Sequence, residues 1–142
     1  MKVLVDTNVV LDVLLDRQPF AKSAARIFAF VEESKIEGFL CATTVTTVDY
    51  LLGQALAPAK ARQALRQLLH LFEIAPVNRP VLEQALQSRI SDFEDAVLEQ
   101  SARLVGADAI ATRNVRDFEK SSVTVFDPVD LIAATDEQQH GS

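Results

Sequence analysis

Cysteine, histidine and tryptophan are scarce in this chain of 142 residues, which has one cysteine, two histidines and no tryptophan. A single cysteine cannot form a disulfide within the chain. The apolar stretch around Cys41 predicts a buried side chain and a reducing, cytoplasmic compartment. So few histidines and cysteines also disfavour a zinc site. We therefore expect His70 on a helix surface and His140 in the tail rather than in a metal site.

Long apolar runs are also missing. No run approaches the roughly 18 residues that a membrane span requires, and Lys2 leads directly into a short strand-like run. We therefore expect neither a membrane span nor a signal peptide. The net charge of −6 argues against a nonspecific coat on nucleic acid, which needs clustered Lys and Arg. A group of acids that binds cations would itself make the total negative.

Short apolar runs alternate with segments of helical periodicity. The runs predict strands at residues 2–5, 39–42, 74–77, 108–112 and 123–126. The periodicity predicts helices at about 9–15, 20–34, 44–56, 58–72, 80–89, 92–105 and 128–134, with Gly38 and Gly106 as stops. Strands separated by helices predict an α/β fold, a three-layer α/β/α sandwich around a central, mainly parallel five-stranded sheet. Residues 1–134 then form one domain, and 135–142 a polar tail.

Acidic residues occur where function collects in a parallel sheet. Asp6 directly follows the first strand, at the carboxyl end of the sheet. Asp92 and Asp95 are three positions apart near a helix start and project from one face, with Glu99 one turn further along. Taken singly, each position is also explained by helix capping or by the favourable charge of an acid in a first helical turn.

A third polar segment follows the strand at 108–112. Asn114 and Asp117 lie beyond its end, in what would by itself be an ordinary turn. Three segments thus bring acids to one sheet edge, where each carboxylate hinders ionisation of its neighbours unless a cation lies between them. Oxygen ligands suit Mg²⁺ or Mn²⁺, and such an ion suits phosphodiester hydrolysis. No serine or cysteine nucleophile with a positioned histidine is visible.

Three motifs, taken together and in this order, resemble the PIN-domain family: Val-Leu-Val-Asp-Thr-Asn at 3–8, Asp-Phe-Glu-Asp-Ala at 92–96, and Ala-Ile-Ala-Thr-Arg-Asn-Val-Arg-Asp-Phe at 109–118. The resemblance extends over about residues 1–133. It implies a small single-domain, VapC-like ribonuclease toxin. Such a protein is a metal-dependent endoribonuclease that uses Mg²⁺ or Mn²⁺, cleaves RNA and is neutralised by an antitoxin protein.

The resemblance also implies roles for individual residues. The catalytic residues would be Asp6, Asp95 and Asp117. The metal ligands would be Asp6, Asp92, Asp95, Asn114 and Asp117, supported by hydrogen bonds from Thr7, Asn8, Thr47 and Thr112. Thr47 stands where many members carry a glutamate. Asp49 lies about 200° further round the helix and does not replace that glutamate.

Surface residues beside these motifs are assigned less directly. Arg113, Arg116 and Lys120 are next to the proposed site in sequence and are predicted to bind substrate, with solvated surface charge as the alternative. An apolar stripe on the fourth helix is interpreted as core, with a dimer or antitoxin surface as the alternative. It consists of Ala64, Leu65, Leu68, Leu69 and Phe72. We expect a homodimer.

Two other functions remain open. A PIN fold that binds RNA or a protein without cleavage is suggested by Thr47 and Asn114, which stand in place of acids. A receiver-like or phosphoryl-transfer α/β domain would also place acids at strand ends. It needs a phosphorylatable aspartate after a central strand, whereas the third strand here leads into Ala-Pro-Val-Asn at 75–78.

Overall fold

The computed structural model describes residues 1–140 and contains five strands and seven α-helices within them. The first half comprises β1 (Lys2–Val5), α1 (Thr7–Leu14), α2 (Ala21–Glu32), β2 (Glu37–Cys41), α3 (Ala42–Ala55) and α4 (Pro58–Leu71). The second half comprises β3 (Glu73–Ala75), α5 (Arg79–Leu86), α6 (Phe93–Leu104), β4 (Ala109–Ala111), the 3₁₀ turn η1 (Val115–Phe118), β5 (Thr124–Phe126) and α7 (Pro128–His140). Every predicted strand and helix is present.

The five strands form one sheet in the order β3-β2-β1-β4-β5, and every neighbouring pair is parallel. The predicted α/β/α sandwich is therefore confirmed, with a sheet that is wholly parallel. Parallel strands place all their carboxyl ends at one edge. β1 and β4 are central neighbours, so the residues that follow Val5 and Ala111 meet there.

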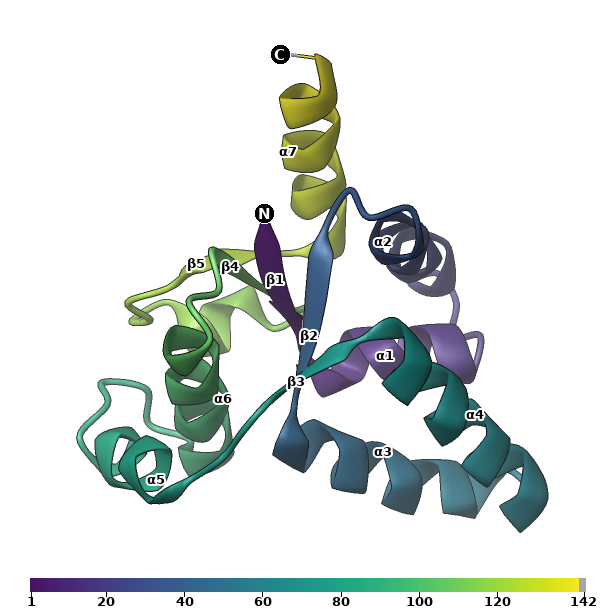
Figure 1. Cartoon of the computed structure of the whole chain (residues 1–142), viewed down its shortest axis with the longest axis horizontal. Coiled ribbons are helices and arrows are strands. Elements are labelled where there is room, and N and C mark those ends of the chain that lie inside the picture. Colours follow the sequence, from purple (N-terminus) through teal and green to yellow (C-terminus); the bar gives the residue numbers. More distant parts are fainter. Residues whose placement is uncertain (141–142) are drawn as a thin grey trace.

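Helices cover both faces of the sheet, and the side chains of β1 show how (Figure 1). Val3 and Val5 pack with α1, α2, α3, α4 and α7, whereas Leu4 points the other way and packs with α5 and α6. All three side chains are fully buried. The chain thus builds two cores on a central strand, and Cys41 is a buried free thiol in the second, as predicted. No helix within residues 1–140 is long and apolar enough to cross a membrane.

Two boundaries differ from the sequence predictions. The helix α7 continues beyond residue 134 to His140, because nothing in that stretch breaks a helix and the buried Thr135 hydroxyl donates to the Leu131 carbonyl at 2.8 Å. Residues 141–142 of the predicted tail, and the His140 side chain, lie outside the described part. Gly38 lies inside β2 rather than ending a helix.

Close packing against one face of the sheet accounts for the glycine at position 38. A Cβ atom there would meet ring atoms of Phe72 and a methyl group of Val31 at 2.8 Å, so no larger residue fits without a shift. Gly106, in contrast, follows α6 with a φ of +70°, which is the left-handed conformation that ends a helix. Its predicted role as a stop is confirmed.

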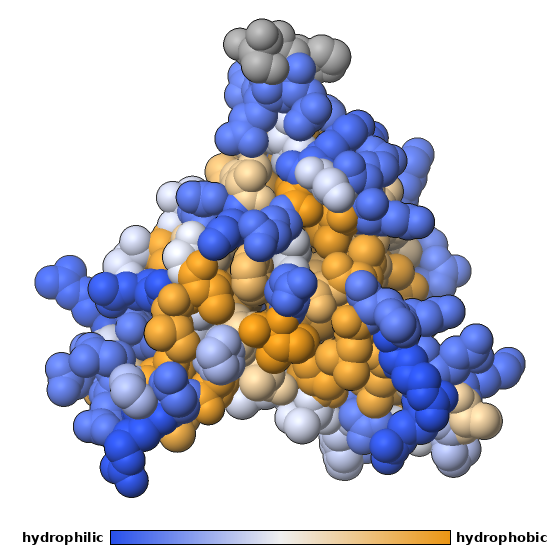
Figure 2. Space-filling view, viewed as in Figure 1, coloured by the Kyte–Doolittle hydropathy of each residue, from blue (hydrophilic) through white to orange (hydrophobic). Residues whose placement is uncertain are grey.

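The stripe on α4 is mainly core. Leu68 and Phe72 are buried, Ala64 and Leu65 pack against the same cluster, and only Leu69 is well exposed. In the space-filling view, apolar residues gather along the middle of the face turned to the viewer, and hydrophilic residues surround them (Figure 2).

Candidate active site at the carboxyl edge of the sheet

Asp6 occupies the centre of the carboxyl edge. Its backbone N–H donates to the Ala111 carbonyl at 2.9 Å, which continues the pairing of β1 with β4 by one residue. One carboxylate oxygen accepts from the Thr7 N–H at 2.7 Å, so Asp6 caps α1 as well as facing the site. The other accepts from the Thr112 hydroxyl at 2.8 Å. The capping explanation therefore holds for this side chain, which also lies at the carboxyl edge of the sheet.

Asp6 is 8% exposed. Burial raises the pKa of its carboxyl, and the negative charges of Glu94 and Asp117 raise it further, although the hydrogen bonds from Thr112 and Thr7 oppose this. The Asn8 amide approaches the same carboxylate at 3.4 Å and accepts the Arg113 N–H at 3.2 Å. Thr7, Asn8 and Thr112 therefore hold the Asp6 carboxylate in place.

Asp95 faces the same centre from α6. Partial burial and the charges of Asp92, Asp6, Asp117 and Glu94, in that order, raise the pKa of its carboxyl to about 7. Five acids thus act on one another across the sheet edge. Asp92 also caps α6, because its carboxylate accepts the Asp95 N–H at 3.0 Å. Glu94 was not predicted for the site, and its position between Asp92 and Asp95 is the signal that could have indicated it.

The acids lie near one another, but their side chains do not converge on a single point where one metal ion could bind. Among the described residues, no three His, Cys, Asp or Glu side chains lie close enough to hold one ion. The donor chemistry nevertheless fits a hard divalent cation, since carboxylates gather at one edge and no imidazole or thiolate is among them. The raised pKa of Asp95 supports this fit, because an adjacent cation would relieve the crowding that raises it.

The turn after β4 supplies the third segment. The Asn114 N–H donates to the Thr112 hydroxyl oxygen at 3.0 Å, and Asp117 lies in η1 with its N–H bonded to the Asn114 carbonyl at 3.0 Å. Both residues are exposed, and no hydrogen bond of the Asn114 side chain occurs within residues 1–140. Asp117 is close enough to Asp6 and Asp95 to raise the pKa of both.

Arg113 makes contacts that its sequence position did not predict. Its guanidinium binds the fully buried carboxylate of Asp12 with distances of 2.6 and 3.2 Å. Asp12 also accepts from the Arg17 Nε at 2.9 Å. Arg113 is thus anchored away from the five acids, whereas Arg116 and Lys120 are exposed beside them in sequence. Asp12 was missed because its partner lies 101 positions away, and no local pattern signals such a pair.

The hydroxyl groups at the start of α3 are arranged differently from the prediction. The Thr44 hydroxyl is buried and accepts from the Thr7 hydroxyl at 3.3 Å, so Thr44 is the α3 residue linked to the Asp6 loop. The Thr47 hydroxyl donates to the Thr43 carbonyl of its own helix at 3.0 Å. Asp49 faces α4, 3.9 Å from the Arg62 Nε. It does not join the acids, in agreement with the expected helix register.

Glu99 does not share the stripe of Asp95, contrary to the sequence expectation. It is 3% exposed and accepts hydrogen bonds from the Ser88 hydroxyl at 2.8 Å, the Gln100 amide at 2.9 Å and the Ser122 N–H at 2.9 Å. Burial opposes its ionisation, but these bonds outweigh burial and lower the pKa of its carboxyl. Glu99 ties α6 to two loops and is structural.

Comparisons with known proteins agree with this geometry. The family model described as PIN domain matches residues 2–116. Ribonuclease VapC1 of Aquifex aeolicus is 24% identical over 130 residues, which cover 88% of this chain and 89% of that protein. DNA-bound VapBC from Salmonella typhimurium has a similar fold, with a TM-score of 0.71, 17% identity and coverage of 90% and 98% of the two chains.

A further solved structure is VapC20 of Mycobacterium tuberculosis, a toxin that cleaves the sarcin–ricin loop. It gives a TM-score of 0.62 at 20% identity, and the alignment covers 76% of this chain and 86% of that one. These structural similarities establish the fold. The match of the family model over most of the sequence establishes membership, and the chain belongs to the PIN domain family.

Proposed function

We propose that this protein is a metal-dependent endoribonuclease that hydrolyses RNA phosphodiester bonds and is the toxin of a toxin–antitoxin pair. The observation that carries the nuclease proposal is the crowding of Asp6 and Asp95, two acids with raised pKa values at the carboxyl edge of the sheet. Similar proteins named as a ribonuclease and as a toxin that cleaves the sarcin–ricin loop support the choice of RNA.

The chain's own residues suggest how the site would work. Asp6 and Asp95 would be the principal ligands of Mg²⁺ or Mn²⁺, with Asp92, Asn114 and Asp117 beside them. Such an ion neutralises charge on the phosphate and lowers the pKa of water. The bonds from Thr7 and Thr112 hold both oxygens of the Asp6 carboxylate in fixed positions. Asp117, on its exposed turn, completes the proposed catalytic set.

Substrate binding requires cations near these acids. Arg116 and Lys120 line a hollow of about 270 Å³ together with Arg89 and Asp117. Three cations beside a site acid can bind the phosphates that flank a cleaved bond, because phosphate contacts supply most nonspecific affinity for nucleic acid. Arg113 would act mainly through its contact with Asp12. We propose Arg116 and Lys120 as the direct phosphate contacts.

The decisive experiment compares two charge-neutralising variants. Asp6→Asn should lose Mn²⁺-dependent cleavage of a mixed RNA pool by at least about 100-fold, since the centre of the site loses its carboxylate. Asp130→Asn, at an exposed acid on α7, should cleave at the parent rate. Chelation by EDTA should stop the parent. Parental activity in the Asp6→Asn protein would remove this residue from the mechanism.

A second candidate function is RNA binding without cleavage. It is favoured by Thr47, whose hydroxyl is bonded to its own helix, and by the lack of three converging acids among the described residues. This candidate predicts RNA binding without metal-stimulated cleavage over many substrates. Thr47→Glu should then create or increase Mn²⁺-dependent cleavage if the missing acid is what limits the site.

An antitoxin or a second copy of this chain would need an exposed surface to bind, and several apolar side chains are exposed. Tyr50, Leu69 and Leu86 are 67%, 52% and 75% exposed. Tyr50 and Leu69 stand on α3 and α4, which pack against each other, and an apolar patch across these two helices would suit a protein partner. A solved structure with a similar fold is by its name a toxin–antitoxin complex, which supports an antitoxin partner here. We also propose a homodimer, which light scattering on the purified chain would test.

A further inference from the structure

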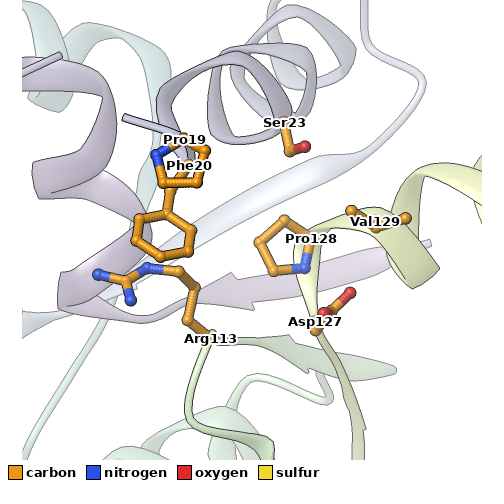
Figure 3. A pocket seen from close by; sticks show the side chains of 7 residues that line it. All are labelled: Pro19, Phe20, Ser23, Arg113, Asp127, Pro128 and Val129. Carbon is orange, nitrogen blue, oxygen red and sulfur yellow. The ribbon is translucent and has the colours of Figure 1, made fainter. Parts of the chain in front are cut away.

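A pocket of about 280 Å³ lies between the start of α2 and the start of α7 (Figure 3). Four of its seven lining residues are apolar or aromatic, and a serine, an arginine and an aspartate complete the wall. The lining residues are Pro19, Phe20, Ser23, Arg113, Asp127, Pro128 and Val129. None of the five site acids lines it, so this pocket is separate from the proposed metal site.

The pocket nevertheless adjoins that site through the backbone. The Thr112 N–H donates to the Phe126 carbonyl at 3.0 Å, which pairs the ends of β4 and β5. The Thr112 hydroxyl also donates to the Asp6 carboxylate. Arg113 directly follows Thr112, Asp127 directly follows Phe126, and both line the pocket. The pocket is therefore one residue from the group that orients Asp6, on the side of the sheet that α2 and α7 cover.

Its aromatic wall is held in place. The Phe20 ring is 41% exposed, and the guanidinium carbon of Arg113 lies 3.9 Å from its centroid. Arg113 cannot move freely, because its guanidinium makes two bonds to the buried Asp12. A ring fixed in this way presents aromatic surface to the pocket at little cost in side-chain freedom. Exposed aromatic rings of this kind are what single-stranded nucleic acids stack on.

The polar side of the pocket is selective. One oxygen of Asp127 accepts the Asp130 N–H at 3.0 Å and so caps α7. The other oxygen makes no hydrogen bond within residues 1–140, and in Figure 3 the carboxylate lies across the pocket from the Phe20 ring. A carboxylate only accepts hydrogen bonds, so it favours a base with an amino group, such as cytosine, over uracil, which has a carbonyl oxygen there.

We propose that this pocket binds one unpaired nucleobase of the RNA, stacked on Phe20 and hydrogen-bonded through an amino group to Asp127. The inference rests on the proposed ribonuclease function and adds a base preference to it. An unpaired base is required, because a base within a duplex cannot present its face to the ring. The base would belong to a nucleotide next to the cleaved phosphate, since Arg113 follows Thr112 directly.

Cytidine and uridine monophosphates are matched probes, because the two bases differ only along one edge, where cytosine has an amino group beside an acceptor nitrogen and uracil has a carbonyl oxygen beside an N–H donor. In EDTA, ¹⁵N-resolved NMR titration should shift the amides of Phe20, Ser23 and Val129, with tighter binding of the cytidine nucleotide. Phe20→Ala should weaken that binding by at least about 5-fold, and Phe20→Trp should restore it. Leu82→Ala, which truncates an apolar side chain outside the pocket with the same 41% exposure as Phe20, should bind as the parent does.

Asp127→Asn tests the polar contact without removing the cap, because asparagine caps helices as well as aspartate does. Its amide N–H₂ can donate to uracil, so the preference for the cytidine nucleotide should vanish or reverse. Equal binding of both nucleotides by the parent, or shifts confined to Arg116 and Lys120, would overturn the proposal. Binding is measured without metal or cleavage. Loss of binding would therefore overturn only this inference, whereas a parent protein that cleaves no RNA in Mn²⁺ would overturn the proposed function.

Discussion

Neutralising Asp95 should stabilise the fold at neutral pH. Its carboxyl has a pKa raised from an ordinary 3.8 to about 7 by partial burial and four neighbouring acids. At about 1.4 kcal/mol for each pKa step, the ionised form would cost at most about 4 kcal/mol of folding free energy. The side chain is partly exposed, so solvent screening reduces this to about 1–2 kcal/mol. Asp95→Asn should recover most of that.

An opposing effect is smaller. Asp95 stands in the first turn of α6, where a negative charge stabilises the helix by about 0.3–1 kcal/mol. The net gain is then about 1 kcal/mol, or a rise in Tm of about 3 °C in a domain of this size. Asp130 is a matched control. It occupies the same turn of α7, and its N–H bonds to Asp127 as that of Asp95 bonds to Asp92, both at 3.0 Å. Asp130→Asn should lower Tm slightly.

The pH dependence gives a second check on Asp95. A raised pKa in the folded state means that protonation favours folding, so the penalty is complete above pH 7 and disappears as the pH falls toward 3.8. The advantage of Asp95→Asn should therefore be largest at pH 8 and less than half as large at pH 5. Thermal unfolding followed by circular dichroism measures both. Equal effects of the two variants at pH 8, or an advantage that grows on acidification, would refute the reasoning.

Other perturbations test the scaffold. Gly38→Ala should cost about 1–3 kcal/mol by overpacking, whereas Gly53→Ala, in open space on α3, should add about 0.5–1 kcal/mol; chemical denaturation compares them. Asp12→Asn should cost about 2–3 kcal/mol, because it leaves two arginines without their buried partner, and an unchanged midpoint would contradict this. Glu99→Gln should cost about 1.5–3 kcal/mol at pH 7, with the difference fading below the ordinary pKa of 4.5 because the folded pKa is lowered.

The sequence was informative where local patterns decide structure. Asp6 follows three fully buried strand residues and Asp95 lies in a capped first turn, so spacing alone brings both to the carboxyl edge. The same argument failed for Glu99. The prediction assumed that residues one helical turn apart share the same surroundings. Four hydrogen bonds instead hold the Glu99 carboxylate on the buried side of α6. Periodicity gives direction along a helix and says nothing of what packs against it.

Arg113 shows the same limit for long-range pairs, and it bears on the charge of the site. From sequence it is a cation beside the acids, yet the fold binds it, together with Arg17, to Asp12. Partial burial and the charges of the neighbouring acids raise the pKa of Asp95, and Arg113 is not among the groups that offset them. Residues at functional sites often lower stability, because selection acts on activity there. An added Mn²⁺ ion that binds these acids should then raise the Tm of the parent, and it should raise the Tm of Asp95→Asn much less. That difference would show that the acids which destabilise the fold are the ones that bind the proposed cofactor.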